Sequence, residues 1–126
     1  MRCIVILTLI VLAADMGATQ AAPPTIEGWW RGSGIVTYRN GADNVQCRVR
    51  YTRATAQSFA VSSLCATESG HYELTGRVIN VGGNRHTGWV QQGNQSGRLT
   101  LVQHSNRLSV TVTSRQGSAR LTLARS

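Results

Sequence analysis

The sequence predicts an all-β protein, an antiparallel meander of about eight short strands that closes into a small barrel. Three observations predict this fold. Turn-forming residues recur roughly every dozen residues, apolar and polar residues alternate between the turns, and no stretch has the apolar spacing of an amphipathic helix. The connections are too short for a helical crossover, so consecutive strands should pair antiparallel. A sandwich of two sheets is the alternative architecture.

The expected strands lie between turn signals such as Asn40-Gly41, Gly82-Gly83 and Gly93-Asn94, which favour the positive φ angles of tight hairpins. The first strand contains Gly32 and Gly34, which permit the strong bending that barrel closure needs. Gly76 does the same in the fourth strand. We place the strands at residues 29–39, 45–53, 58–66, 71–81, 85–91, 97–103, 107–114 and 118–125.

Alternation assigns the two faces of these strands. In the second strand, every other residue from Val45 to Tyr51 is apolar, and Arg48 and Arg50 lie on the opposite face. The same period of two continues through the third and fourth strands and the last three. One face is therefore expected to be buried and the other hydrated. The apolar positions of the later strands are Leu99, Leu101, Leu108, Val110, Val112, Leu121 and Leu123.

Residues 1–21 have the pattern of a secretory signal peptide. Arg2 gives a positive start, residues 3–14 form an apolar run too short to span a bilayer, and small residues at Thr19 and Ala21 precede a cleavage point. We expect cleavage after Ala21 and a periplasmic or secreted protein. A short uncleaved anchor is the alternative.

The remaining 105 of the 126 residues contain 12 arginines, no lysine and 4 acidic residues, which gives a net charge of +8. We assign residues 22–27 to a short N-terminal extension and residues 28–126 to a single barrel domain. This length excludes a two-domain enzyme, a helical membrane protein and a repeat array. An outer-membrane barrel is disfavoured because several strands are short and no aromatic residue follows Trp89.

Cys47 and Cys65 are the two cysteines of the mature chain, and both fall on the apolar face of neighbouring strands. In an oxidising compartment this arrangement predicts a disulfide in the barrel interior. Closing the loop would contribute about 3 kcal/mol. Two free buried thiols are the alternative.

The opening residues Gly28-Trp29-Trp30-Arg31-Gly32-Ser33-Gly34 resemble the Gly-x-Trp start of calycin-type barrels, such as lipocalins and avidins, in which the tryptophan closes one barrel end. Gly28-x-Trp30-x-Gly32-x-Gly34-x-Val36, Cys47-Arg48-x-x-Tyr51 and Leu64-Cys65-Ala66 also resemble a group of small secreted β proteins of alphaproteobacteria. These resemblances imply a calycin-like barrel that is periplasmic or exported. They carry over no catalytic residue.

No enzyme is expected, because the residues that catalysis needs are few and dispersed. Glu68, His71 and Glu73 cluster near one turn, but their spacing fits a solvated hairpin tip better than a metal or acid–base site. The serines lack a nucleophile-elbow motif and an identifiable base. We therefore predict no catalytic residues, no metal and no cofactor.

The aromatic residues supply the candidate ligand site. Alternation points six of them, Phe59 among them, toward the barrel interior, where they would form an apolar pocket with phenol and indole groups, unless they only fill the core. The candidate ligand-binding residues among them are Trp30, Tyr38, Tyr51, Tyr72 and Trp89.

The arginines supply a second candidate surface. Arg48 and Arg50 lie side by side on the outward face and could contact a polyanion, although a solvated surface is the simpler interpretation. We expect no specific nucleic-acid binding, because the charge is spread over many strands.

The leading functional hypothesis is a noncatalytic exported protein that binds a small apolar or amphipathic ligand in its open end. The alternative is an interaction protein, either an inhibitor of an exported enzyme or a binder of anionic envelope components. A structural accessory without a ligand is a third possibility. None of these would span a membrane after processing.

Overall fold

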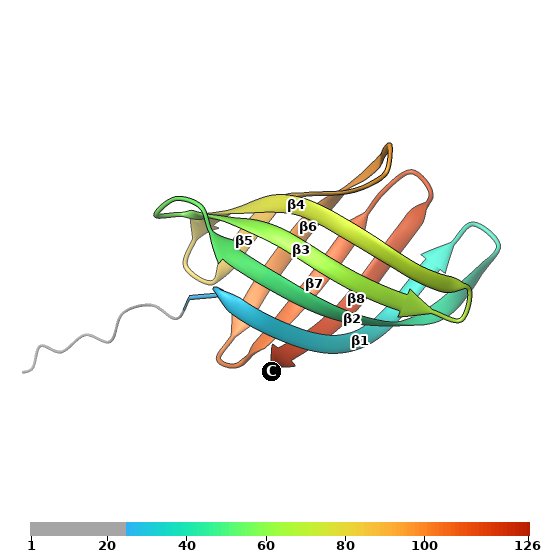
Figure 1. The fold of residues 1–126 in the computed structure, drawn as a ribbon, viewed down its shortest axis with the longest axis horizontal. Coiled ribbons are helices and arrows are strands. Elements are labelled where there is room, and N and C mark those ends of the chain that lie inside the picture. The colour runs from blue at the N-terminus through green and yellow to red at the C-terminus, as the bar shows by residue number, and fades with distance from the viewer. Residues whose placement is uncertain (1–24) are drawn as a thin grey trace, which may run out of the picture.

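The computed structural model describes residues 25–126, so the predicted signal peptide and its cleavage point lie outside the described residues. These residues form eight antiparallel strands in sequence order, and β1 pairs with β8 to close the barrel (Figure 1). The predicted all-β barrel is therefore confirmed, and the sandwich alternative is wrong. The strands are β1 (Gly28–Tyr38), β2 (Gly41–Arg53), β3 (Ser58–Thr67), β4 (Gly70–Gly82), β5 (Arg85–Gln92), β6 (Gln95–His104), β7 (Arg107–Thr113) and β8 (Gly117–Arg125).

The strand boundaries differ from the expected ones mainly at the hairpins. Tyr38 pairs with Gly41, so the first turn is Arg39-Asn40 and β2 begins four residues earlier than expected. Pairing continues to the end of the hairpin because Ala42, Asp43 and Asn44, none of which is buried, can extend an antiparallel ladder without contributing to the core. No helix able to cross a membrane occurs within residues 25–126.

Glycines inside the strands permit close strand approach. A Cβ atom on Gly34 would collide with the Arg120 carbonyl oxygen of β8, and one on Gly76 would collide with the Trp89 carbonyl oxygen of β5. Bending at such positions lets neighbouring strands coil enough to close a small barrel. The bending predicted from Gly34 and Gly76 thus corresponds to close backbone contacts.

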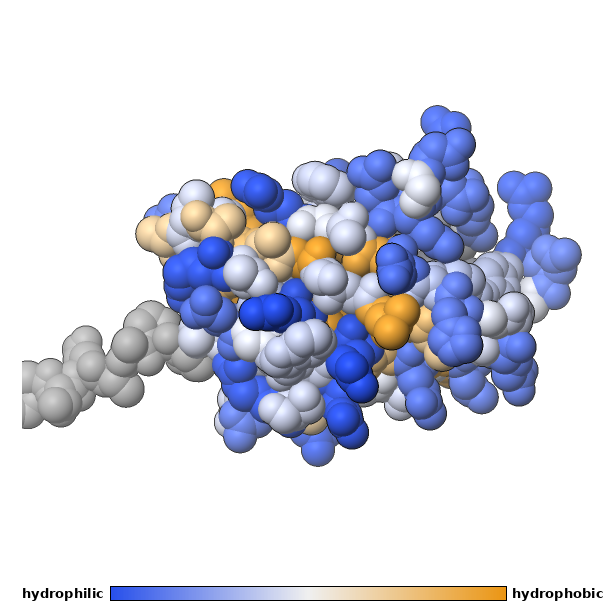
Figure 2. All heavy atoms as spheres, in the orientation of Figure 1, coloured by the Kyte–Doolittle hydropathy of each residue, from blue (hydrophilic) through white to orange (hydrophobic). Residues whose placement is uncertain are grey.

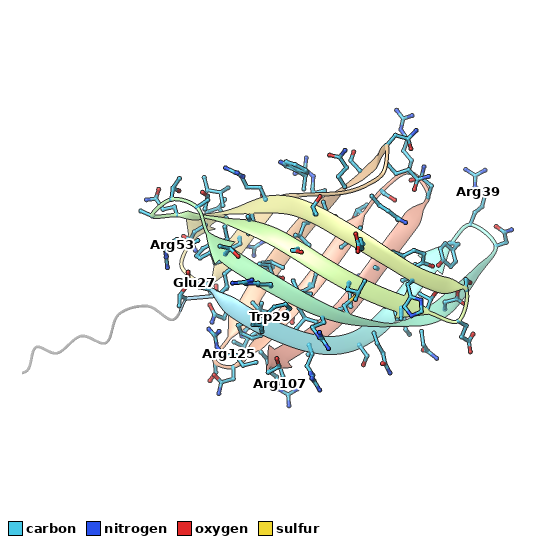
Figure 3. The ribbon with its side chains drawn as sticks, in the orientation of Figure 1. Glu27, Trp29, Arg39, Arg53, Arg107 and Arg125 are labelled. Atoms are coloured by element: carbon cyan, nitrogen blue, oxygen red, sulfur yellow. A yellow bond between two sulfur atoms is a disulfide. The ribbon has the colours of Figure 1, made fainter. Side chains whose placement is uncertain are left out.

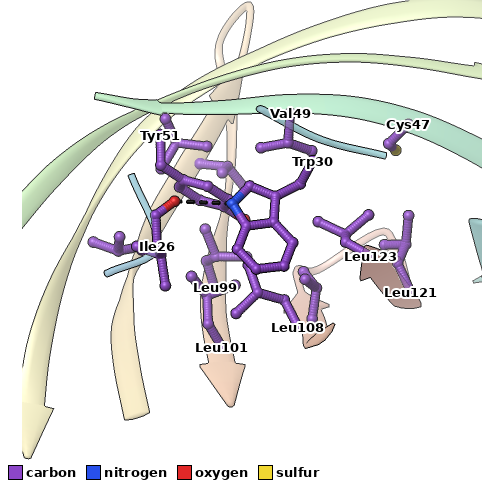
Figure 4. Packing of buried hydrophobic residues seen from close by; sticks show 14 of the residues in the cluster. Ile26, Trp30, Cys47, Val49, Tyr51, Leu99, Leu101, Leu108, Leu121 and Leu123 are labelled. Carbon is purple, nitrogen blue, oxygen red and sulfur yellow. Dashed lines mark hydrogen bonds between the residues drawn. The ribbon is translucent and has the colours of Figure 1, made fainter. Parts of the chain in front are cut away.

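One end of the barrel is closed by a packed core around Trp30 (Figure 4). Trp30 is fully buried, and its indole N–H donates a hydrogen bond of 2.9 Å to the Ile26 carbonyl oxygen. The Arg125 guanidinium lies 4.4 Å from the Trp30 ring centroid and donates hydrogen bonds to the Glu27 and Thr25 carbonyl oxygens. These contacts fix the segment that enters β1. Closure of one end by the tryptophan of the Gly-x-Trp segment is as the resemblance implied.

Ile26 is also fully buried in this core, although the sequence analysis placed it in an extension before the barrel domain. The segment before β1 therefore supplies an apolar plug for the closed end. The remaining core side chains here come from β2, β3, β4, β6, β7 and β8, chiefly Val49, Tyr51, Phe59, Val61, Val78, Leu99, Leu101, Leu108, Val110 and Leu123.

Candidate functional site: the open end of the barrel

The opposite end of the barrel contains a cavity of about 470 Å³, lined by residues of all eight strands. Its volume arises because small residues, including Gly97 and Ala119, occupy positions on β6 and β8 where the closed end carries leucines. A volume of this size is within the range of about 300–1,000 Å³ found for small-molecule sites. The cavity is the strongest candidate for a ligand site in the part of the chain that the structure describes.

The wall of the cavity is apolar, and its rim is polar but uncharged. Its wall contains Val36, Val45, Leu74, Val90, Val112, Ala119 and Leu121. Its rim contains Tyr38, Tyr72, Gln92, Gln95, Ser96, Ser114, Gln116 and Ser118. No aspartate, glutamate, arginine or histidine lines it. Such a surface fits a ligand with an apolar body and a neutral polar end.

The Cys47–Cys65 disulfide also lines this cavity. The two cysteines are direct partners in the β2–β3 ladder, with their Cα atoms 4.1 Å apart, and both side chains are buried. The disulfide predicted from strand parity is therefore confirmed. It crosslinks β2 and β3 beside the cavity.

Two phenols meet at the rim of the cavity. The Tyr38 hydroxyl, from β1, lies 3.4 Å from the Tyr72 hydroxyl, from β4, and Tyr72 also forms a 2.9 Å hydrogen bond with the Thr67 hydroxyl. The hydrogen bond with Tyr72, partial burial and the nearby Asp43 carboxylate together raise the pKa of Tyr38 to about 12. Tyr38 therefore stays neutral at physiological pH and can both donate and accept a hydrogen bond.

The five aromatic residues predicted to bind a ligand separate into three groups. Tyr38 and Tyr72 line the cavity. Trp30 and Tyr51 are buried in the closed end, where burial raises the pKa of Tyr51, and neither lines the cavity. Trp89 is 48% exposed, so the expectation that it points inward is wrong.

Trp89 points outward because its neighbours Gly88 and Val90 set the parity of β5. Val90 and His86 are buried, and alternation then places Trp89 on the outer surface. Apolar residues occur on both faces of this strand, so the sequence pattern alone is ambiguous. Sequence reasoning also missed the glutamines of the rim, because their position depends on where each hairpin turns.

The arginines predicted to contact a polyanion lie on the outer surface, away from the cavity. Arg50 stacks over the exposed Trp29 at 5.5 Å from the ring centroid, and Arg48 pairs across the ladder with Arg31. Figure 3 shows Arg39 at the cavity end of the barrel, far from Arg53, Glu27 and Arg125 at the closed end. Glu68, His71 and Glu73 form no metal-binding group within residues 25–126.

No protein-family model and no curated protein sequence matches this chain. Among solved structures, a redesigned β-barrel named mFAP1, bound to DFHBI, superimposes with a TM-score of 0.69 at 13% identity, covering 79% of this chain and 94% of that chain. A second redesigned β-barrel gives a TM-score of 0.68 at 16% identity, covering 80% and 91% of the two chains. A third structure, EF1p2_mFAP2b bound to DFHBI, gives a TM-score of 0.66 at 10% identity, covering 80% of this chain and 94% of that chain.

Sequence identities this low establish similarity of fold and nothing finer. They agree with the strand order and closure of the present barrel. The chain thus has a closed, antiparallel, eight-stranded β-barrel fold.

Proposed function

We propose that this protein is a noncatalytic, exported binding protein that holds a small amphipathic ligand with an uncharged polar end in the open end of its barrel. The observation that carries the proposal is the cavity of about 470 Å³, with its apolar wall and a rim of phenols, amides and hydroxyls. The ligand's apolar body would replace water against Leu74, Val90 and Val112. Removing that apolar surface from water supplies the main driving force for binding.

The polar end of the ligand would lie at the Tyr38–Tyr72 pair. A charged group would lose hydration there without meeting an opposite charge on the cavity lining, which is costly. The Asp43 carboxylate, close enough to raise the pKa of Tyr38, would also repel an anion. An alcohol, amide or ketone can instead hydrogen-bond with either phenol at no electrostatic cost.

The decisive experiment uses a substitution on one wall of the cavity whose larger side chain fills it. Ala119 lies on the cavity side of β8, whereas Ala124 on the same strand is exposed outward. We expect the neutral dye Nile red to bind the native protein and the Ala124→Leu variant equally. The Ala119→Leu variant should keep its melting temperature and lose dye binding. If the native protein binds no dye, or Ala119→Leu binds it as well as the native protein does, the proposal is wrong.

A matched series tests the chemistry of the polar end. Decanol, decanoate and decylammonium share one chain length and differ in charge, and each can be titrated against bound Nile red. Decanol should compete best because no lining side chain offsets the desolvation of a charged end. Tighter binding of decanoate would instead assign the headgroup to arginines of the neighbouring turns, and the uncharged-ligand proposal would fail.

Export is the second part of the proposal. The signal pattern of residues 1–21 supports it, and so does the Cys47–Cys65 disulfide, because disulfides persist mainly in oxidising compartments. Intact mass of protein recovered from the periplasm should show a chain that begins at Ala22 and lacks two hydrogens. Retention of residues 1–21 would favour the uncleaved anchor.

A further inference from the structure

We propose that the outer surface of β4–β6 around Trp89 docks on a bilayer that contains anionic phospholipids. This surface, the Trp89 face, consists of Arg77, Ile79 and Val81 on β4, Arg85 and Trp89 on β5, and Arg98 on β6. It lies outside the barrel, so the inference is independent of the ligand proposed for the cavity.

The strand register brings these residues together. Trp89 pairs directly with Arg77 on one side and with Arg98 on the other, so it lies between two arginine residues in the ladder. Ile79 follows Arg77 on the same face of β4 and is a diagonal neighbour of Trp89, within reach of its side chain. Val81 is the unpaired residue of an irregularity between the Asn80–His86 and Gly82–Arg85 pairs, and its side chain is exposed. The three apolar members are about half exposed, with 49% for Ile79, 55% for Val81 and 48% for Trp89.

The charge of this region is entirely positive. Residues 74–126 contain seven arginines and no aspartate or glutamate. The nearest carboxylate along β4 belongs to Glu73, four residues before Arg77, which corresponds to about 13 Å at the usual rise of a strand. The ion pair recorded within residues 25–126 is Arg53–Glu27, outside this face. The cations of the Trp89 face are thus available to an external anion.

The mixture of residues favours a lipid surface. Tryptophan prefers the headgroup level of a bilayer, aliphatic side chains can enter its apolar boundary, and arginine side chains extend toward lipid phosphates. A single-stranded nucleic acid is bound instead by several aromatic rings in a basic groove. The Trp89 face has one aromatic ring and two aliphatic residues, and it lies on the convex outer surface of a barrel. It therefore fits a lipid surface better than a single-stranded nucleic acid.

The face that carries Arg48 and Arg50 is less suited to the same role. Arg50 already stacks on Trp29, the exposed Leu64 pairs with both Arg48 and Glu73, and Glu73 places a carboxylate at this face. Trp29 on β1 and Leu64 on β3 are also separated from each other by β2. Figure 2 shows one side of the barrel, where hydrophobic side chains occur among hydrophilic ones. Arg48 and Arg50 therefore provide a matched control with the same charge.

The test measures sedimentation of the exported protein with vesicles of phosphatidylcholine, with or without one quarter phosphatidylglycerol. We expect binding to the anionic vesicles only, and its loss at high salt. The Arg77→Gln/Arg98→Gln variant should lower the partition coefficient by about fivefold for each arginine, roughly 25-fold in all. The Arg48→Gln/Arg50→Gln variant removes the same charge and should change binding less than fivefold.

A second measurement reports insertion of the indole. In a Trp29→Phe background the emitting residues are the buried Trp30 and the exposed Trp89. Anionic vesicles should shift this emission to shorter wavelength, and Trp89→Phe should abolish the shift. Equal losses in the two double-arginine variants would show a global charge effect and overturn the proposal. Displacement of the vesicles by a single-stranded oligonucleotide, with the same dependence on Arg77 and Arg98, would reassign the face to nucleic acid.

Discussion

The two ends of this barrel are built from the same strands but have opposite packing. At the closed end, Trp30, Tyr51 and Leu101 belong to one buried cluster with the Ile26 plug. At the open end, Gly97 and Ala119 occupy inward positions and leave a cavity. A small domain can thus place most of its buried apolar packing at one end and keep a cavity for binding at the other. Substitutions at the two ends should therefore have different consequences.

The largest effect is expected for Trp30→Ala. Removing a buried indole forfeits its transfer free energy and leaves a void, which together cost about 3–5 kcal/mol of unfolding free energy. The matched control is Trp89→Ala, an exposed tryptophan whose removal should change stability by less than about 0.5 kcal/mol. Urea unfolding measures both. Similar losses for the two variants would refute the division into a packed end and an open end.

Loss of the disulfide should have the next largest effect. Cys47 and Cys65 are 18 residues apart, and releasing a loop of that length costs about 3 kcal/mol in the chain-entropy model. The Cys47→Ala/Cys65→Ala variant should show this loss in urea. Its affinity for Nile red should also fall, because the disulfide lines the cavity. Unchanged stability after reduction of the native protein would contradict this prediction.

His86 should make the closed end sensitive to acid. It is buried against Phe59, its Nδ1 atom has no hydrogen-bond partner among the described residues, and burial lowers its pKa. The pKa of His86 in the folded protein lies below its unfolded value near 6.5. The stability that the neutral, buried imidazole contributes is therefore fully present above pH 6.5 and is lost as the pH falls below it.

Between about pH 7 and pH 5, the native protein should therefore lose stability with a slope below the one-proton limit of about 1.4 kcal/mol per pH unit. The His86→Leu variant should show a smaller loss across the same interval. Thermal unfolding at each pH measures the difference. An identical pH dependence in both proteins would remove His86 as the cause.

The smallest effect on stability is expected for Tyr38→Phe at the open end. Its hydroxyl is at the rim, so the melting temperature should change little, whereas decanol affinity should fall by about 1 kcal/mol, or roughly fivefold. Because the pKa of Tyr38 is raised to about 12, native binding should be constant from about pH 6 to pH 9. Calorimetric titration measures both properties. A loss of decanol affinity between those pH values would show that another group controls the rim.

The alternating pattern alone predicts most of the fold. Val45, Cys47, Val49 and Tyr51 share one parity, and this was enough to identify the buried face and the disulfide partner. The pattern could not assign each aromatic residue to a site. Trp30 and Tyr38 are both on β1, yet one fills the closed end and the other lines the cavity, because they are eight positions apart along the strand.

Strand number, antiparallel order, the disulfide and the outward arginines were determined by the sequence itself, because each depends on local turn chemistry and a period of two. Three features were decided only by the tertiary structure. They are the insertion of Ile26 into the core, the outward direction of Trp89 and the position of the cavity. Each depends on which residues of different strands come to the same height along the barrel axis when the barrel closes. That height is set by the register of all eight pairings together, which no single stretch of sequence contains.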